Sequence, residues 1–169
     1  MAQDEGRFGR ITDIRSCWAP KGIRPIVPRH GARTFVSVYA AVSMAPGKMT
    51  SLIMPYASTA MMNPLLDEVP TDFKEYFVIM LVQEAGWHKS RGLKIHKNIR
   101  PIPQPSQIPE LNPVGHLWEE LGKKYLPDKA YTSHRGVEMA LGKGLRNLHA
   151  DPNKISSMTG FGFSFVNLS

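Results

Sequence analysis

Cysteine is almost absent from this sequence, and long apolar runs are missing altogether. The single Cys17 excludes an internal disulfide and any cysteine-based zinc cluster, which fits a reducing compartment. No run approaches the roughly 18 apolar residues of a membrane span, and the polar start MAQDEGRFGR lacks the apolar core of a signal peptide. We therefore expect a cytoplasmic protein that has no membrane partner.

Acidic residues are scarce relative to basic ones, 14 against 21, which gives a net charge of +7. One group of basic residues runs from Arg7 to Arg33 with Asp13 as its only acid, and another runs from Lys89 to Arg100 with none. Such patches attract phosphate backbones by counterion release, although a basic surface without a dedicated partner has the same composition. The residues that we expect to bind nucleic acid are Arg7, Arg10, Lys89, Arg91, Lys94, Lys97 and Arg100.

The first half of the chain predicts a hairpin, a helix and a buried strand. Residues Arg33–Ser43 and Met49–Met54 are rich in strand formers, and the turn dipeptide Pro46-Gly47 between them indicates an antiparallel hairpin. A helix is expected over Thr59–Val69, capped by its first residue or the serine before it, with its internal proline kinking or shortening it. The continuous apolar run Tyr76–Val82 predicts a central strand that is covered on both faces.

The second half predicts an edge strand followed by helices. Five prolines between Pro101 and Pro113 exclude a long helix or central strand there and leave a short strand near Ile99 and an extended loop. A helix then begins at Asn112 as its cap, with proline at its first position, and another begins near Ser133. Asp151 starts a last short helical turn. These elements together indicate a layered α/β domain.

Several short motifs occur in a fixed order along the chain: DEGRFGRI from Asp4, SCWAPKGIRP from Ser16, VQEAGWHKS from Val82 and PELNPVGHLWEEL from Pro109. Together they resemble the catalytic domain of mariner-like DDE transposases of bacterial insertion sequences, over nearly the whole chain. In that family the last two motifs read D-G-A-G-W-H or D-N-A-x-x-H, and P-E-L-N-P-(V/I)-E-x-x-W. The resemblance implies a ribonuclease-H-like mixed sheet flanked by helices, with DNA as the partner.

The same resemblance implies which residues form the active site. Asp4 matches the first metal-binding aspartate, whereas Gln83 and Gly115 stand at the other two acid positions. The family's chemistry is DNA cleavage and strand transfer, in which three carboxylates hold two Mg²⁺ or Mn²⁺ ions about 3.5–4 Å apart. Because two charges are missing, we expect metal binding and activity to be impaired or lost.

Two nearby acids are candidate replacements. Glu84 follows Gln83, and successive strand side chains point to opposite faces, so Glu84 points away unless the strand bulges or ends there. Glu119 shares the helical face of Gly115 but lies about 6 Å farther along the axis. A role for either acid stays open, and we expect neither to be a simple replacement.

Other motif residues have a structural and a functional interpretation. Trp118 is expected to fill the core rather than to stack on a base. His88 fits a hydrogen-bonded structural role or a contact near the active site, and Trp18 and Trp87 stay undecided. Asn112 is explained by helix capping without a role in the site.

We expect one domain spanning residues 1–169, because 42% hydrophobic residues can bury a sizeable core. The resemblance implies a truncated first strand and a missing helix-turn-helix domain, so that transposon ends are read by a separate chain or not at all. A homodimer is compatible with this interpretation. Three functions remain: an impaired transposase domain, a non-catalytic DNA-binding or oligomerising module, and a remnant without a selected role.

Overall fold

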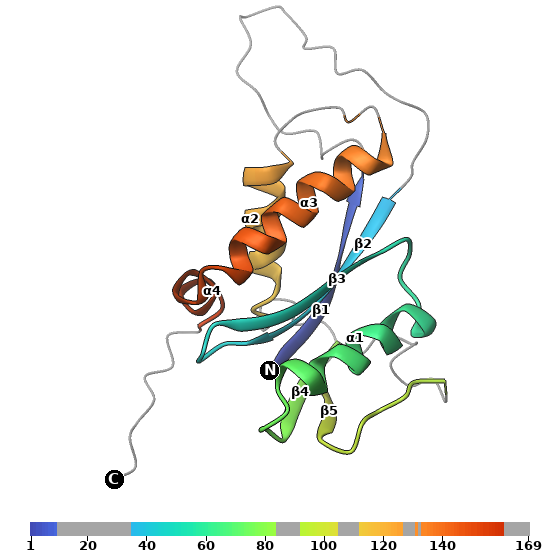
Figure 1. The fold of residues 1–169 in the computed structure, drawn as a ribbon, viewed down its shortest axis with the longest axis vertical. Helices are drawn as coiled ribbons and strands as arrows, with labels where there is room; N and C mark the ends of the chain where they lie inside the picture. Colours follow the sequence, from blue (N-terminus) through green and yellow to red (C-terminus); the bar gives the residue numbers. More distant parts are fainter. Residues whose placement is uncertain (10–34, 84–91, 105–111, 127–130, 132, 161–169) are drawn as a thin grey trace, which may run out of the picture.

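The computed structural model describes residues 1–9, 35–83, 92–104, 112–126, 131 and 133–160. In this part of the chain, five strands form one mixed sheet and helices cover both of its faces (Figure 1). The strands are β1 (Ala2–Gly9), β2 (Phe35–Ser43), β3 (Lys48–Met54), β4 (Val78–Val82) and β5 (Ile99–Pro103). The helices are α1 (Thr59–Asp72), α2 (Gly115–Tyr125), α3 (His134–His149) and α4 (Pro152–Thr159). None of the described helices is long and apolar enough to cross a membrane.

The strands are ordered β3-β2-β1-β4-β5. Strand β2 is antiparallel to both β1 and β3, and β4 is parallel to both β1 and β5. The predicted hairpin is confirmed as β2 and β3. Its turn contains Gly47 at φ 60°, a backbone conformation that favours glycine. A Cβ there would also lie 1.8 Å from the carbonyl oxygen of Pro152, so the turn packs directly against the start of α4.

Alternation along the strands separates two apolar layers. On one face, Val38, Ala40 and Val42 of β2 pack with residues of α2, α3 and α4. On the other face, Tyr39 and Ala41 pack with α1 and with the buried side of β4. Figure 1 shows α2 and α3 on the first face and α1 on the other. The sheet is therefore covered on both sides along its middle strands.

Three of the four described helices begin with a side-chain cap, and that of α1 was predicted as a cap. Ser58 accepts a hydrogen bond from the Met61 amide at the start of α1, Ser133 caps α3, and Asp151 caps α4. Of the two effects expected of Pro64, a kink or a shortening, the shortening is wrong, because α1 continues to Asp72. Proline cannot donate the helical hydrogen bond, and the free energy lost in this way is offset by the burial of apolar side chains. The buried side chains of α1 are Met62, Leu65, Leu66 and Val69.

The starts of β4 and α2 also differ from the sequence prediction. Strand β4 begins at Val78, and it is not covered on both faces, since Ile79 is 50% exposed. The reason is that α2, α3 and α4 pack mainly on β1, β2 and β3. Helix α2 begins at Gly115 rather than directly after Asn112, whose side chain accepts a hydrogen bond from the Val114 amide at 3.1 Å and forms the turn before the helix.

Candidate functional site

Asp4 lies in the middle of the sheet on β1, with its side chain toward α2. Its neighbours on the same face of the strand, Ala2 and Phe8, belong to the core beneath α2 and α3. Asp4 is 8% exposed, and the indole Nε1 of Trp118 donates a hydrogen bond to its Oδ2 at 2.9 Å. The carboxylate is therefore held from one side by the helix that also carries Gly115.

Trp118 has a more specific position than core filling. Its indole lies over Gly6, where a Cβ would come within 2.8 Å of Trp118 Cδ2, and it packs edge to face on Phe8 at a centroid distance of 6.0 Å. The predicted core packing is correct, but the bond to Asp4 was not predicted. The spacing contained a signal for it, since Trp118 is three residues after Gly115 and shares its side of the helix.

Gln83 lies at the end of the strand that pairs with the start of β1. Strands β1 and β4 run parallel with Ala2 opposite Leu81. If this register continued for two more residues, Asp4 would stand opposite Gln83, and residues in register in a parallel pair project to the same face. Gln83 follows directly after the last residue of β4 and is partly buried.

Gly115 is the first residue of α2, one helical turn before Trp118. Among the described residues, no atom would lie within 4 Å of a Cβ at this position, so the space next to it is open. The helix therefore presents Gly115 on the side from which Trp118 reaches Asp4. Three elements, β1, β4 and α2, contribute the three positions that the motifs single out.

Burial dominates the electrostatics of β1. It raises the pKa of Asp4 from 3.8, and the Trp118 hydrogen bond lowers that pKa only in part. Burial, followed by the charge of Asp4, raises the pKa of Glu5 from 4.5 to about 7. The side-chain amide of buried Gln3 lies close enough to Glu5 to lower this pKa, yet neither that amide group nor Glu5 Oε2 makes a hydrogen bond of normal geometry. Anionic charge on β1 is thus disfavoured unless a cation offsets it.

No second carboxylate joins Asp4 among the described residues. Glu5 alternates to the opposite face of β1, toward α1. Glu119 accepts a hydrogen bond from Lys123 at 2.7 Å on the exposed side of α2, and its side chain is 61% exposed. Glu84 lies outside the described residues. The structure therefore gives no support to replacement by Glu119.

The donor set does not fit a site for two divalent ions. Asp4 supplies a carboxylate, Gln83 a neutral amide and Gly115 no side chain, whereas such ions favour anionic oxygen ligands. In the part of the chain that the structure describes, no group of three His, Cys, Asp or Glu residues can hold a metal. The strands and the helix that carry the three acid positions are present, but two of the three carboxylates are missing.

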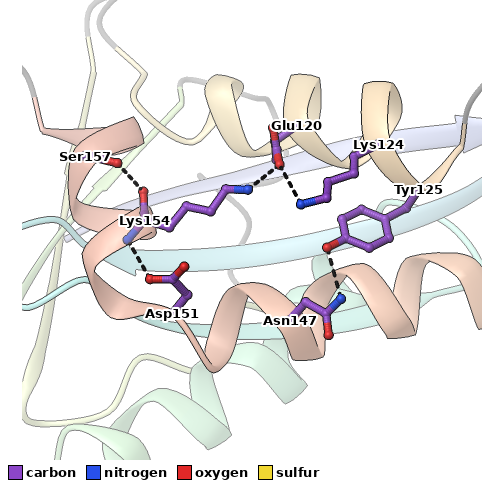
Figure 2. A network of polar contacts seen from close by, with 7 residues as sticks. All are labelled: Glu120, Lys124, Tyr125, Asn147, Asp151, Lys154 and Ser157. Carbon is purple, nitrogen blue, oxygen red and sulfur yellow. Dashed lines mark hydrogen bonds and ion pairs between the residues drawn. The ribbon is translucent and has the colours of Figure 1, made fainter.

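Polar contacts join α2, α3 and α4, the helices on the face of the sheet to which Asp4 points (Figure 2). Glu120 of α2 pairs with Lys124 on its own helix and with Lys154 of α4. Tyr125 of α2 accepts a hydrogen bond from the Asn147 amide of α3 at 3.1 Å. These contacts fix α2 against α3 and α4, and with it the positions of Gly115 and Trp118.

The expected DNA-binding residues are only partly described. Lys94, Lys97 and Arg100 are exposed in or before β5, and Arg7 is exposed on β1. The side-chain amide of Asn63 on α1 donates a hydrogen bond to the Gly92 carbonyl and accepts one from the Lys94 backbone N–H, and these bonds fasten the segment to α1. The other expected contacts, Arg10, Lys89 and Arg91, lie outside the described residues, as do His88, Trp18 and Trp87.

Solved structures with a similar fold come from a transposase. The chain matches the Mos1 transposase paired-end complex with left transposon end at a TM-score of 0.60 and 15% identity, covering 94% of this chain and 55% of that chain. It matches the Mos1 mariner paired-end complex with Mn at a TM-score of 0.61 and 15% identity, covering 96% of this chain and 56% of that chain. The chain thus spans a little over half the length of those proteins, and the likeness confirms the predicted ribonuclease-H-like fold.

Sequence comparison identifies the family. An uncharacterized protein of Sinorhizobium fredii is 27% identical over 122 residues, which are 72% of this chain and 90% of that protein. The sequence profile of the family described as DDE superfamily endonuclease matches residues 1–136. The chain therefore belongs to the DDE superfamily endonuclease family, and its fold is ribonuclease-H-like.

Proposed function

We propose that the chain serves DNA transposition as a DDE domain that engages DNA and whose metal-dependent strand cleavage and transfer are impaired. The observation that carries this proposal is Asp4 standing as the lone carboxylate at the three acid positions. Relatives of the same fold were solved with transposon DNA and with Mn, which supports DNA as the partner and a divalent ion as the ancestral cofactor. The open space around a Cβ at Gly115, among the described residues, supports the restoration of a side chain at that position.

A restoration experiment tests the proposal. Gln83→Asp with Gly115→Glu returns two negative charges beside Asp4, and Mg²⁺ affinity measured by calorimetry should rise. Mn²⁺-dependent nicking of supercoiled plasmid should be absent from the present chain and appear in the double variant. Adding Asp4→Ala to the double variant is the matched control, which should abolish both gains.

Two results would contradict the proposal. Nicking by the unaltered chain that is lost in Asp4→Ala would mean that another group completes the site and that the enzyme is intact. Unchanged Mg²⁺ affinity in the double variant would show that Gln83 and Gly115 are not the acid positions.

The second candidate is a non-catalytic DNA-binding or oligomerising module, in the form of a homodimer or a partner of a separate helix-turn-helix chain. The exposed cations Lys94, Lys97 and Arg100 favour it. Replacing all three by glutamine should weaken plasmid binding and reduce its salt dependence, with the slope falling by about 0.9 for each phosphate that is no longer neutralised. Binding that keeps its salt slope in this variant would remove these residues from the interface.

A further inference from the structure

An apolar groove opens at the Met1 end of the sheet, away from the candidate site's helix α2. It has a volume of about 530 Å³ and is lined by the β2–β3 turn at Pro46, by Phe73, Tyr76 and Phe77 after α1, and by Ile79 of β4. Tyr76 and Phe77 are each 63% exposed, and Ile79 is 50% exposed. Large apolar side chains gathered at one exposed place mark an interaction surface.

The chain contains a segment whose chemistry matches this groove. Residues 161–169 read FGFSFVNLS, and their three phenylalanines alternate with glycine and serine. In an extended segment this spacing sets Phe161, Phe163 and Phe165 on one face. The segment has no charged side chain, and the described residues that line the groove are mostly apolar, with Lys48 as their only charged side chain.

The helix before this segment starts beside the groove. Pro152, the first residue of α4, packs on Gly47, the neighbour of groove residue Pro46. Helix α4 has 8 residues and so extends about 12 Å from that point. Gly160 then leaves the helix with extended backbone angles, φ −69° and ψ 108°. Nine further residues span up to about 30 Å, which is enough to return to the groove.

We propose that residues 161–169 dock in this groove of the same chain, with their phenylalanines against Tyr76 and Phe77. The segment covers apolar surface that the described helices leave open, and it joins α4 to the start of β4. This interaction is independent of Asp4 and of any catalytic activity. A negative result for this docking would therefore leave the proposed function unaffected.

Disulfide trapping in the full chain tests the docking. In a Cys17→Ser background, Phe163→Cys is combined with Phe77→Cys, and the matched control combines it with Tyr56→Cys, another exposed aromatic at 56%. Phe77 and Tyr56 are both on the surface, and circular dichroism verifies that each variant folds. The Phe77 pair should close within one chain at least about tenfold faster than the control, because docking raises the effective concentration. Non-reducing electrophoresis separates single chains from linked ones.

Each other outcome overturns the proposal. Equal rates in the two pairs would show that the segment does not dock at the groove. Disulfides that form only between chains, at a rate that rises with protein concentration, would show that a second copy fills it. As an independent readout, deleting residues 161–169 should increase the fluorescence of an apolar dye, and a Phe77→Ser change should reduce that gain.

Discussion

Glu5 gives the sharpest test of the electrostatics on β1. Its pKa is raised from 4.5 to about 7, first by burial and then by the charge of Asp4. The folded chain therefore binds this proton more tightly than the unfolded chain, and stability falls as the pH rises from about 4.5 to about 7. The shift corresponds to an upper limit of about 3 kcal/mol, and screening at the partly exposed carboxylate reduces the expected loss to about 1–2 kcal/mol.

Glu5→Gln removes the charge and keeps the shape of the side chain. At about pH 8 the variant should be more stable than the unaltered chain by about 1–2 kcal/mol, whereas near pH 4.5 the two should be nearly equal. Urea unfolding at both pH values measures the free energies. Glu138→Gln, on the exposed side of α3, is the control and should change neither. If Glu5→Gln kept the full pH dependence, the assignment of this loss to Glu5 would be refuted.

Three glycines give further predictions, each checked by chemical denaturation. Gly6→Ala should destabilise by about 1–3 kcal/mol through its clash with Trp118, and a Trp118→Phe background should relieve part of this; strictly additive losses would count against the contact. Gly122→Ala should stabilise by about 0.5–1 kcal/mol, since its Cβ meets nothing within 4 Å. Gly144→Ala should destabilise, because its Cβ would lie 2.6 Å from Leu121 Cδ2, and a gain there would contradict the packing of α2 on α3.

Features set by neighbouring residues were predictable from the sequence. The hairpin at Gly47 and the caps Ser133 and Asp151 depend on backbone conformation and hydrogen bonds within a few residues. The family and its fold followed from ordered motifs, and the sequence profile confirms the family over residues 1–136. The assignment of Asp4, Gln83 and Gly115 as acid positions stays a prediction.

Other features were decided only by tertiary packing. Helix α1 continues past Pro64 because its apolar side chains are buried against the sheet. Ile79 is exposed because α2, α3 and α4 pack mainly on β1, β2 and β3. The hydrogen bond from Trp118 to Asp4 joins residues 114 positions apart, so it exists only once α2 lies across β1. Local pattern indicated most of the helices and strands, and the ordered motifs indicated the family. The packing of β1, β4 and α2 decided the surroundings of Asp4, because side chains this distant in sequence interact only through the register and burial of the whole sheet.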